Sequence, residues 1–457
     1  MKNILIAIRS IFKKGRHNVM KIVSLGIGLA VGLVLIAKVY FEQSYDGFYP
    51  DRDRVYQVWA KYQQNGGELK DYPQTSGGIA PTMQQQIPEI ETVTRYTSFG
   101  DWTFTMTDTK MKYSGRCIIA DSCFFDILPR PMLIGNAKEV LSTPMYVLVS
   151  SRIAKNIGGD VIGKNFTVDS SPGRTMTIGG VFEEVPENSH SRYDVIVSMA
   201  SAGRFMWEGS PTNMLGNDRY ISYVKLHKGV NPLALEEQVH TFVNSYFPPE
   251  EQQKTGFNIG FSFHELDGLH KELPQVKRMT WILSLLAFAL IFTAVMNYIL
   301  IVISSIVNRS KEVAVHKCYG ASENNIHGMM FGEALVHIVL SLILALLLIL
   351  AFRGTVEELL ATSLDSLLLS NGSLVLLGIC ILVFFVSGFM PGSLYARIPV
   401  ASAFRNYREN KRIWKKALLL VQFVATGVLV TRLVFVARQC LLRVSWRGLY
   451  LSCQDSG

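Results

Sequence analysis

Long apolar blocks separated by charged segments dominate the pattern of hydrophobic and polar positions along the chain. Four blocks are clearly apolar over the roughly 20 residues that an α-helix needs to cross a hydrocarbon core, and they cover residues 19–40, 280–303, 329–352 and 373–394. A weaker fifth block covers residues 417–437. The pattern predicts a membrane protein with an α-helical transmembrane bundle of four clear spans and a weak fifth.

The first block is apolar between two lysines, Lys21 and Lys38, whose side chains we expect to snorkel toward the membrane surface. A cleaved signal peptide is the alternative, because basic residues precede the block. The apolar run exceeds the about 7–15 residues of a signal peptide, and no small-residue cleavage site follows Ala37. We interpret residues 19–40 as an uncleaved anchor.

Residues 41–279 change to short segments that predict one α+β domain. Three segments alternate apolar and polar residues as half-buried strands do, namely 54–62, 174–182 and 219–227. A glycine pair in the second of them could form a bulge. Asn231 and Pro232 begin a predicted helix. Its apolar face consists of Leu235, Val239, Phe242 and Val243.

Basic residues gather beside the apolar blocks. The chain of 457 residues has a net charge of +9 but only 18% charged residues, against about 25% in soluble domains. Residues 1–18 and 395–416 are strongly basic, as short cytoplasmic segments of membrane proteins are. This distribution indicates the lipid bilayer as a partner and no nucleic acid. Alternation then predicts a cytoplasmic N-terminus, residues 41–279 outside, and residues 304–328 in the cytoplasm.

The N-terminal segment has a second pattern. Apolar residues recur there at helical spacing opposite basic residues, and they are Ile4, Ile8, Ile11 and Phe12. This pattern favours an amphipathic helix over residues 1–18, lying at the cytoplasmic face of the membrane. An ordinary basic flank with accidental periodicity is the alternative.

No convincing catalytic or metal-binding set is present in the outside domain. The stretch 158–165, GGDVIGKN, nearly matches the motif of a phosphate-binding loop, but Asn165 replaces the hydroxyl residue that would hold magnesium. We interpret it as a turn. His264 and His270 are six residues apart, where zinc on one helical face needs four. We therefore expect no enzyme activity and no metal.

Two cysteines, Cys117 and Cys123, both fall in the predicted outside domain. A disulfide between them is one alternative, since that compartment permits oxidation. Two free thiols are the other, and nothing in the sequence decides between them.

The segment 304–328 is polar and lies between the second and third spans. Residues 309–317 read as a helix that continues out of the second span, and small residues then break it. A new helix follows with one apolar side, formed by Ile326, Met330, Phe331 and Leu335. Such a protrusion suits transmission of force from a soluble partner. A polar hairpin without a partner is the alternative.

Residues 297–335 resemble the coupling region of FtsX-type permease domains in MacB-like ABC transporters. The matching residues are Asn297, Arg309, Glu312, Lys317, Gly320, Ala321, Ser322 and Glu333. Ala314 and His316 depart from the family pattern, which has glycine and arginine there. Segments 121–136, 180–190 and 387–405 resemble other parts of the same family, so residues 41–279 resemble a MacB-type periplasmic core domain and 280–394 an FtsX-like permease domain.

The resemblance implies a permease subunit of the bacterial inner membrane that transmits motion from a cytoplasmic ABC ATPase in efflux or export. ATP would be bound by that separate subunit, and this chain would hold no cofactor. The residues implied to contact the ATPase or transmit its motion are Arg309, Lys311, Glu312, His316, Lys317, Gly320, Ala321, Ser322 and Glu333. A homodimer or pairing with a second permease half is implied, with an outer-membrane or cell-wall partner. The alternatives are an FtsX-like regulator of a cell-wall hydrolase and a membrane-anchored sensor or receptor.

The C-terminal region differs from this pattern. Residues 415–430 resemble the start of the second half in duplicated, eight-span members of the family, yet Arg432 lies within the fifth block. A central arginine costs about 2.5–3.5 kcal/mol for insertion, and residues 438–457 are atypical. Our hypothesis is that the chain is the N-terminal half of a longer permease with a truncated or frameshifted tail.

Overall fold

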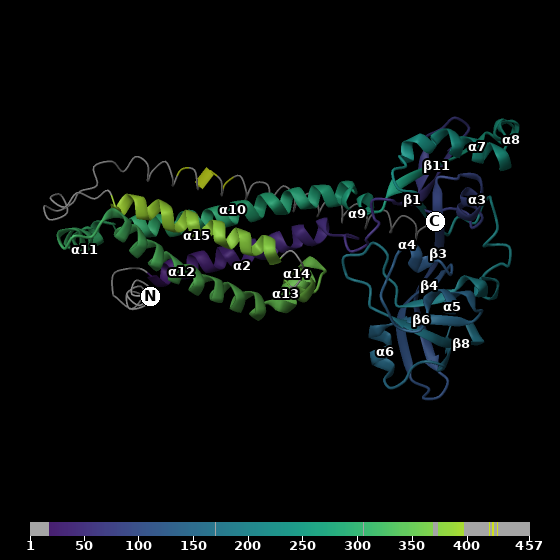
Figure 1. Ribbon diagram of the computed structural model, residues 1–457, viewed down its shortest axis with the longest axis horizontal. Coiled ribbons are helices and arrows are strands. Elements are labelled where there is room, and N and C mark those ends of the chain that lie inside the picture. Colours follow the sequence, from purple (N-terminus) through teal and green to yellow (C-terminus); the bar gives the residue numbers. More distant parts are fainter. Residues whose placement is uncertain are drawn as a thin grey trace, which may run out of the picture. The chain divides into compact units, whose positions relative to one another are not determined.

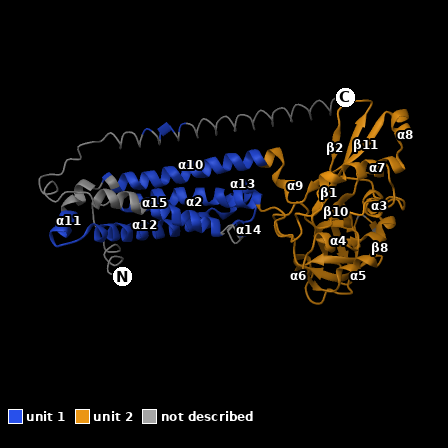
Figure 2. Ribbon diagram, turned by 45° about the horizontal axis from the view of Figure 1, so that its top comes forward, with its two compact units in different colours: residues 1–43, 277–457 blue, residues 44–276 orange. Residues whose placement is uncertain are grey.

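The chain divides into two compact units, which Figure 2 colours separately. A helical unit comprises residues 1–43 and 277–457, and a sheet unit comprises Ser44–Val276. The computed structural model describes residues 18–169, 171–304, 306–368 and 373–396, and residues 420, 423, 424 and 427. The predicted amphipathic helix, the basic segment 397–416, nearly all of the fifth block and the tail 438–457 lie outside the described residues.

The helical unit is built from long apolar helices (Figure 1). Its elements are α2 (Asn18–Gln43), α10 (Pro274–Ser304), α11 (Ile306–Cys318), α12 (Glu323–Ala351), α13 (Arg353–Leu360), α14 (Leu364–Leu368) and α15 (Ser373–Ala396). Among the described residues, α2, α10 and α12 are long and apolar enough to cross a membrane. The fourth predicted span coincides with α15, whose described apolar stretch, Leu374–Val386, is shorter.

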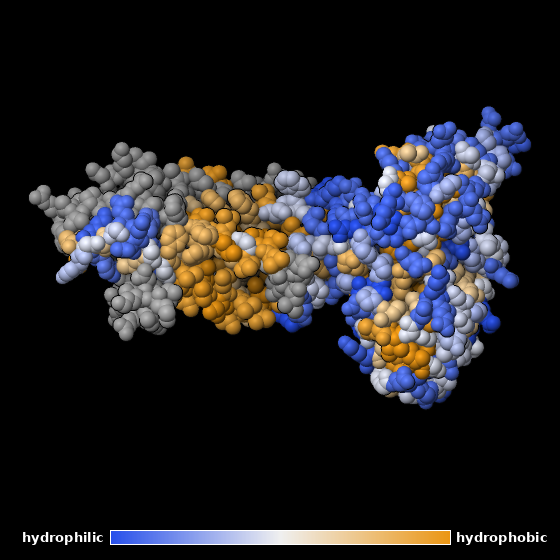
Figure 3. Space-filling model, in the orientation of Figure 1, coloured by the Kyte–Doolittle hydropathy of each residue, from blue (hydrophilic) through white to orange (hydrophobic). Residues whose placement is uncertain are grey.

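The surface of the helical unit matches a membrane environment. Figure 3 shows a band of hydrophobic residues in the middle of the helical unit, whereas the visible face of the sheet unit is mostly hydrophilic. Large apolar side chains of α10 are exposed at the surface of the protein, including Trp281, Leu285 and Phe288. In water such a surface would be costly, but in lipid it needs no protein cover.

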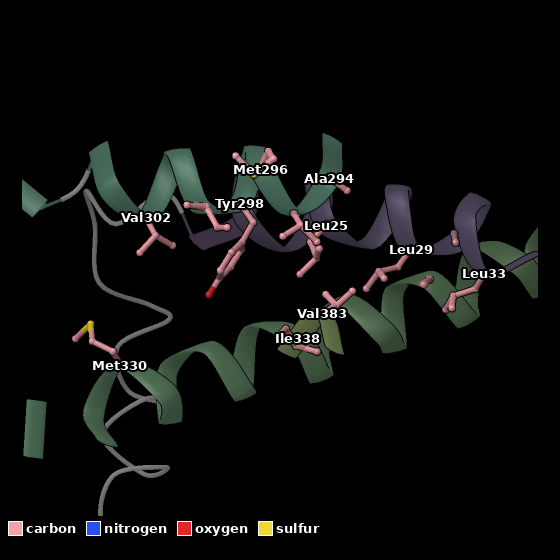
Figure 4. Close-up of a cluster of buried hydrophobic side chains, with 14 of the residues drawn as sticks. Leu25, Leu29, Leu33, Ala294, Met296, Tyr298, Val302, Met330, Ile338 and Val383 are labelled. Carbon is pink, nitrogen blue, oxygen red and sulfur yellow. The ribbon is translucent and has the colours of Figure 1, made fainter. Parts of the chain in front are cut away.

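Small residues let α2 pack closely against its neighbours. A Cβ added at Gly28 would overlap the Cβ of Ala294 on α10, and one at Gly32 would overlap Ile291. A Cβ at Gly26 would lie 2.9 Å from Leu344 Cδ2 on α12. Close backbone approach of this kind is the usual basis of helix association in membranes. Figure 4 shows the buried apolar side chains of this bundle core, from α2, α10, α12 and α15.

The sheet unit holds a mixed sheet of eleven strands in the order β11-β1-β10-β3-β4-β9-β6-β8-β5, with β2 beside β1 and β7 beside β3 and β8. The strands are β1 (Val55–Gln64), β2 (Lys70–Tyr72), β3 (Ile90–Met106), β4 (Lys112–Ala120), β5 (Met132–Ile134), β6 (Tyr146–Ser150), β7 (Asn165–Val168), β8 (Ser171–Phe182), β9 (Val195–Ser198), β10 (Ile221–Leu226) and β11 (Phe257–Glu265). Parallel pairs join β4 to β9 and β6 to β8.

Short helices accompany this sheet. They are α3 (Ile79–Gln86), α4 (Phe124–Ile127), α5 (Ala137–Ser142), α6 (Ser151–Ile157), η1 (Met199–Arg204), η2 (Pro232–Leu235), α7 (Glu236–Tyr246), α8 (Pro249–Thr255) and α9 (Gly268–Lys271). Three apolar clusters bury the sheet faces, and aromatic side chains such as Phe124, Phe166 and Phe242 lie at their centres. The predicted α+β class is confirmed.

The strand and helix predictions are confirmed locally. The three alternating segments form β1, β8 and β10. The register of β8 on β6 shifts between Ile178 and Gly180, so the glycine pair forms the predicted bulge. The Asn231 side chain accepts a hydrogen bond from the Leu233 backbone N–H at 3.1 Å and caps the predicted helix, whose first turn is η2.

Several side chains lie elsewhere than the pattern suggested. Lys21 and Lys38 do not snorkel, because they are 0% and 7% exposed and pair within the helical unit. Cys117 and Cys123 are both free thiols, one inside β4 and one before α4. His264 stacks on Trp59, and His270 stacks on Tyr45.

Candidate functional site

The segment 304–328 forms a helix, a tight turn and the start of the next helix. The turn after α11 is a Schellman motif. The Ala321 N–H donates to the His316 carbonyl at 3.0 Å, the Gly320 N–H donates to the Lys317 carbonyl at 3.0 Å, and Gly320 has a φ of +85°. The Ser322 side chain then accepts a hydrogen bond from the Asn325 N–H and caps α12. Both helix ends are thus closed by their own residues.

One side of α11 is fixed in the bundle. Val313 and Ala314 are each 1% exposed and belong to the same apolar cluster as α2, α10 and α12. Ala314 occupies the position where the resembling family has glycine, and its methyl group is accommodated in this core. Because the packed side leaves little freedom of rotation, α11 is held by the membrane helices.

The opposite side of the turn is open. Val315 and His316 are exposed on α11, and Tyr319 is 88% exposed. An exposed tyrosine is a strong candidate for a protein contact, since aromatic side chains are enriched where partners bind. The segment therefore joins a buried apolar face to an exposed face of mixed polarity.

The predicted site residues divide into three groups. Arg309 and Lys311 lie on α11, and their side chains are outside the described set. Glu312 and Lys317 are half-buried, each with interactions of its own. His316, Gly320 and Ser322 are exposed, and Ala321 is half-buried.

Glu333 differs from the rest of the predicted set. It lies on α12 well beyond the Ser322 cap, is 7% exposed, and faces Lys21 of α2. Glu333 therefore offers little surface to a soluble partner. Its place is inside the helix bundle.

A set of polar side chains is buried between the apolar helices, namely Asn18, Lys21, Tyr298, Glu333, His337 and Ser341. Sequence reasoning named Lys21 and Glu333 but did not expect their burial, and it missed the other four. The Tyr298 hydroxyl lies 3.3 Å from His337 Nδ1, and the Ser341 hydroxyl donates to the Ile22 carbonyl at 3.1 Å. The signal that could have found them is an ionisable residue within or at the edge of an apolar block. Such residues are rare in membrane spans and usually mark functional positions.

The other end of α2 carries a second buried charge pair. Lys38 lies 2.7 Å from Glu42 on the same helix, and its Nζ donates to the Thr362 hydroxyl at 2.7 Å. Thr362 stands between α13 and α14. Both ends of α2 are thus fixed by polar contacts to other parts of the helical unit.

The chain that follows α2 is anchored in the sheet unit. Asp46 is 0% exposed and accepts hydrogen bonds from the Ser189 hydroxyl at 3.0 Å and the His190 N–H at 3.2 Å. The Asn188 side chain donates to the Ser44 carbonyl at 2.9 Å. Burial of the neighbouring Tyr96 side chain raises the pKa of its hydroxyl to about 12. The first residues of the sheet unit are therefore held in its core.

No group of His, Cys, Asp or Glu side chains suited to a metal ion occurs among the described residues. The stretch 158–165 is an open turn before β7, where the Lys164 side chain donates to the Gly158 carbonyl.

Comparison with known families gives two matches. The family described as the MacB-like periplasmic core domain matches residues 20–242, and the family described as the FtsX-like permease C-terminal domain matches residues 284–400. The first match begins in α2 and the second extends past the end of α15, with residues 243–283 between them. A search of curated proteins finds no match.

Two solved structures are similar to the chain. One is a domain described as part of a permease protein from Porphyromonas gingivalis, with 32% identity over 48% of this chain and 91% of that one, and a TM-score of 0.44. The other is the extracellular domain of the noncanonic ABC-type transporter YknZ from Gram-positive bacteria, with 10% identity over 45% of this chain and 98% of that one, and a TM-score of 0.32.

Proposed function

Because the chain belongs to the MacB/FtsX-type permeases of ABC transporters, we propose that it transmits ATP-driven motion from a cytoplasmic ATPase subunit to its extracellular domain. The observation that carries the proposal is the form of α11. One side of this helix is buried in the bundle through Val313 and Ala314, and the turn beyond it is capped and exposed. A push on the turn would therefore move the membrane helices rather than bend a loop.

The residues of the segment take distinct roles in this proposal. Tyr319 and His316 would contact the ATPase, with Arg309 and Lys311 adding positive charge on the same helix. Glu312 and Lys317 would set its electrostatic complementarity, which governs specificity and association rate more than affinity. Gly320 and Ser322 would keep the turn rigid through their helix caps.

ATP itself would be bound by the partner subunit, since the chain carries no phosphate-binding loop among its described residues. The motion would serve efflux or export, with the substrate handled by the extracellular domain. Pairing with a second copy or a second permease half would complete the transporter. An outer-membrane or cell-wall partner would then receive the movement outside.

Copurification tests the proposal. The full chain is extracted in mild detergent and the bound ABC ATPase is quantified for wild type, Glu312→Lys and Lys317→Glu. We expect each charge reversal to lower ATPase recovery at least tenfold, because like charges would then oppose each other at the contact. Membrane insertion should be unchanged.

A matched control reverses an exposed lysine of the sheet unit, Lys254→Glu on α8. This variant should recover as much ATPase as wild type. Wild-type recovery in both segment variants would remove the segment from the docking surface. Absence of any ABC ATPase in the wild-type preparation would contradict the proposed function itself.

A further inference from the structure

A buried ion pair links the first and third long helices. Lys21 Nζ of α2 lies 3.7 Å from Glu333 Oε1 of α12, with the lysine side chain 0% and the glutamate side chain 9% exposed. Lys21 also donates a hydrogen bond to Asn18 Oδ1 at 3.2 Å. Charges inside an apolar bundle are costly and persist where they are paired.

The chain connections give this pair a particular importance. α12 begins at the exposed turn, at the Ser322 cap, and leads through α13 and α14 to α15. α2 ends at Gln43, and the next residue, Ser44, begins the sheet unit. A displacement that starts at the turn and travels along α12 must therefore pass sideways into α2 to reach the sheet unit by this route.

Most other contacts between α2 and α12 are apolar and less directional, and the Ser341 hydroxyl adds one hydrogen bond to the Ile22 carbonyl at 3.1 Å. Gly26 lies against Leu344 and Ser341, and apolar residues such as Leu25 and Ile338 share one cluster. Apolar surfaces can slide along each other at small cost, because the interaction does not depend on orientation. An ion pair, in contrast, is lost when its partners move apart.

We propose that the Lys21–Glu333 pair is a positioning contact that locks the register of α2 and α12, so that the two helices move as one body. A slip of one helical turn, about 5.4 Å, would separate the charges within an apolar interior. That state is disfavoured, so α2 follows α12. The inference rests on the proposed function, since it assigns a route by which the stroke leaves the segment 304–328 and reaches Ser44, in addition to the direct chain connection through α10.

The test uses the permease–ATPase complex in nanodiscs. Hydrogen–deuterium exchange of the peptide that contains Ser44–Tyr49 is measured with and without ATP and orthovanadate. Wild type should show a nucleotide-dependent change in exchange at this first part of the sheet unit. Lys21→Met/Glu333→Met replaces the ion pair by apolar side chains of similar length, which is neutral or stabilising for many buried pairs.

We expect the double methionine variant to keep the wild-type melting temperature within about 3 °C and to bind the ATPase normally, but to lose at least 80% of the nucleotide-dependent change. Lys21→Arg should retain the change. The exchanged pair Lys21→Glu/Glu333→Lys should recover more of it than either single reversal. If the Lys21–Glu333 pair only stabilised the fold, the double methionine variant, which is stable, would show the full nucleotide-dependent change.

The matched control is Lys38→Met/Glu42→Met, which removes a buried ion pair whose two charges both lie on α2, together with the Lys38 hydrogen bond to Thr362, but leaves the contact between α2 and α12 intact. It should retain the nucleotide-dependent change. A normal change in the Lys21/Glu333 methionine variant, or an equal loss in the control, would overturn the inference. If wild type itself shows no change with nucleotide, the proposed function fails instead, so the two failures are distinguishable.

Discussion

Single residues decide how rigid the exposed turn is. Gly320 occupies the left-handed region with a φ of +85°, and a Cβ added there would meet no atom within 4 Å. The cost of any other residue is therefore a backbone cost and not a steric clash. The small residues at 320–322 indicated in the sequence that a helix ends there. The hydrogen bonds from Ala321 and Gly320 to α11 could be identified only in the structure.

Gly320→Ala should weaken the turn by about 1 kcal/mol, the typical cost of placing a side chain in the left-handed region. Backbone amides of residues 320–322 should then exchange several-fold faster in deuterium-exchange measurements. Gly320→Asn should lie close to wild type, because asparagine tolerates this region. Gly378→Ala on α15, where a Cβ also meets nothing within 4 Å, is the control and should not slow or speed exchange at the turn. Equal exchange in Gly320→Ala would contradict the assigned cap.

A second residue-scale prediction concerns Asp51 in the sheet unit. Hydrogen bonds from Lys225 at 2.6 Å and from Arg54 at 3.0 Å hold the pKa of this carboxyl below its ordinary value of 3.8. The folded chain therefore binds fewer protons here than the unfolded chain. This contribution to stability is present above about pH 4 and is lost as the pH falls through the folded pKa.

Asp51→Asn should consequently lose less melting temperature than wild type when the pH is lowered from 5 to 3. The side chain of Asp51 is 38% exposed, so solvent screening limits the difference to below about 1 kcal/mol. Thermal unfolding of the full chain in detergent at the two pH values measures it. If the melting temperature of Asp51→Asn falls as much as that of wild type between pH 5 and pH 3, Asp51 carries none of the acid sensitivity.

Elements were predictable to different degrees. The apolar blocks predicted α2, α10 and α12, because a membrane span needs a long continuous apolar run, which is easy to recognise in a sequence. The face of α12 that packs was only partly recognised, since Ile326 and Met330 are buried whereas Leu335 is 38% exposed. In a membrane helix both faces are apolar, so hydropathy alone does not separate packing from lipid contact.

Helix packing gives a prediction at this scale. Gly28→Ala should destabilise the bundle by about 1–3 kcal/mol, the usual cost of overpacking, because its Cβ would overlap the Cβ of Ala294. The double variant Gly28→Ala/Ala294→Gly should recover most of the loss, since it exchanges the two methyl positions. Melting temperatures in detergent measure both. Additive losses in the double variant would contradict the close contact between α2 and α10.

At the scale of the whole molecule, the order of apolar blocks and short segments was sufficient to anticipate a helical unit and a mixed sheet unit. The strand order was not predictable, because β1 pairs with β10 and β11 across more than 160 residues and no local pattern records such pairings. Likewise, the placement of Glu333 opposite Lys21 depends on two helices far apart in sequence. The helix, turn and helix of segment 304–328 were predictable, because their residues are contiguous and the small residues that break the helix are a local signal.

The proposed function requires that the turn after α11 contacts an ABC ATPase. A photocrosslinking amino acid introduced at Tyr319, 88% exposed, tests it in intact cells, with the same amino acid at Trp207, 65% exposed in the sheet unit, as the control. We expect an adduct with the ATPase at position 319 and none at position 207. No ATPase adduct at position 319, or equal adducts at both positions, would contradict it.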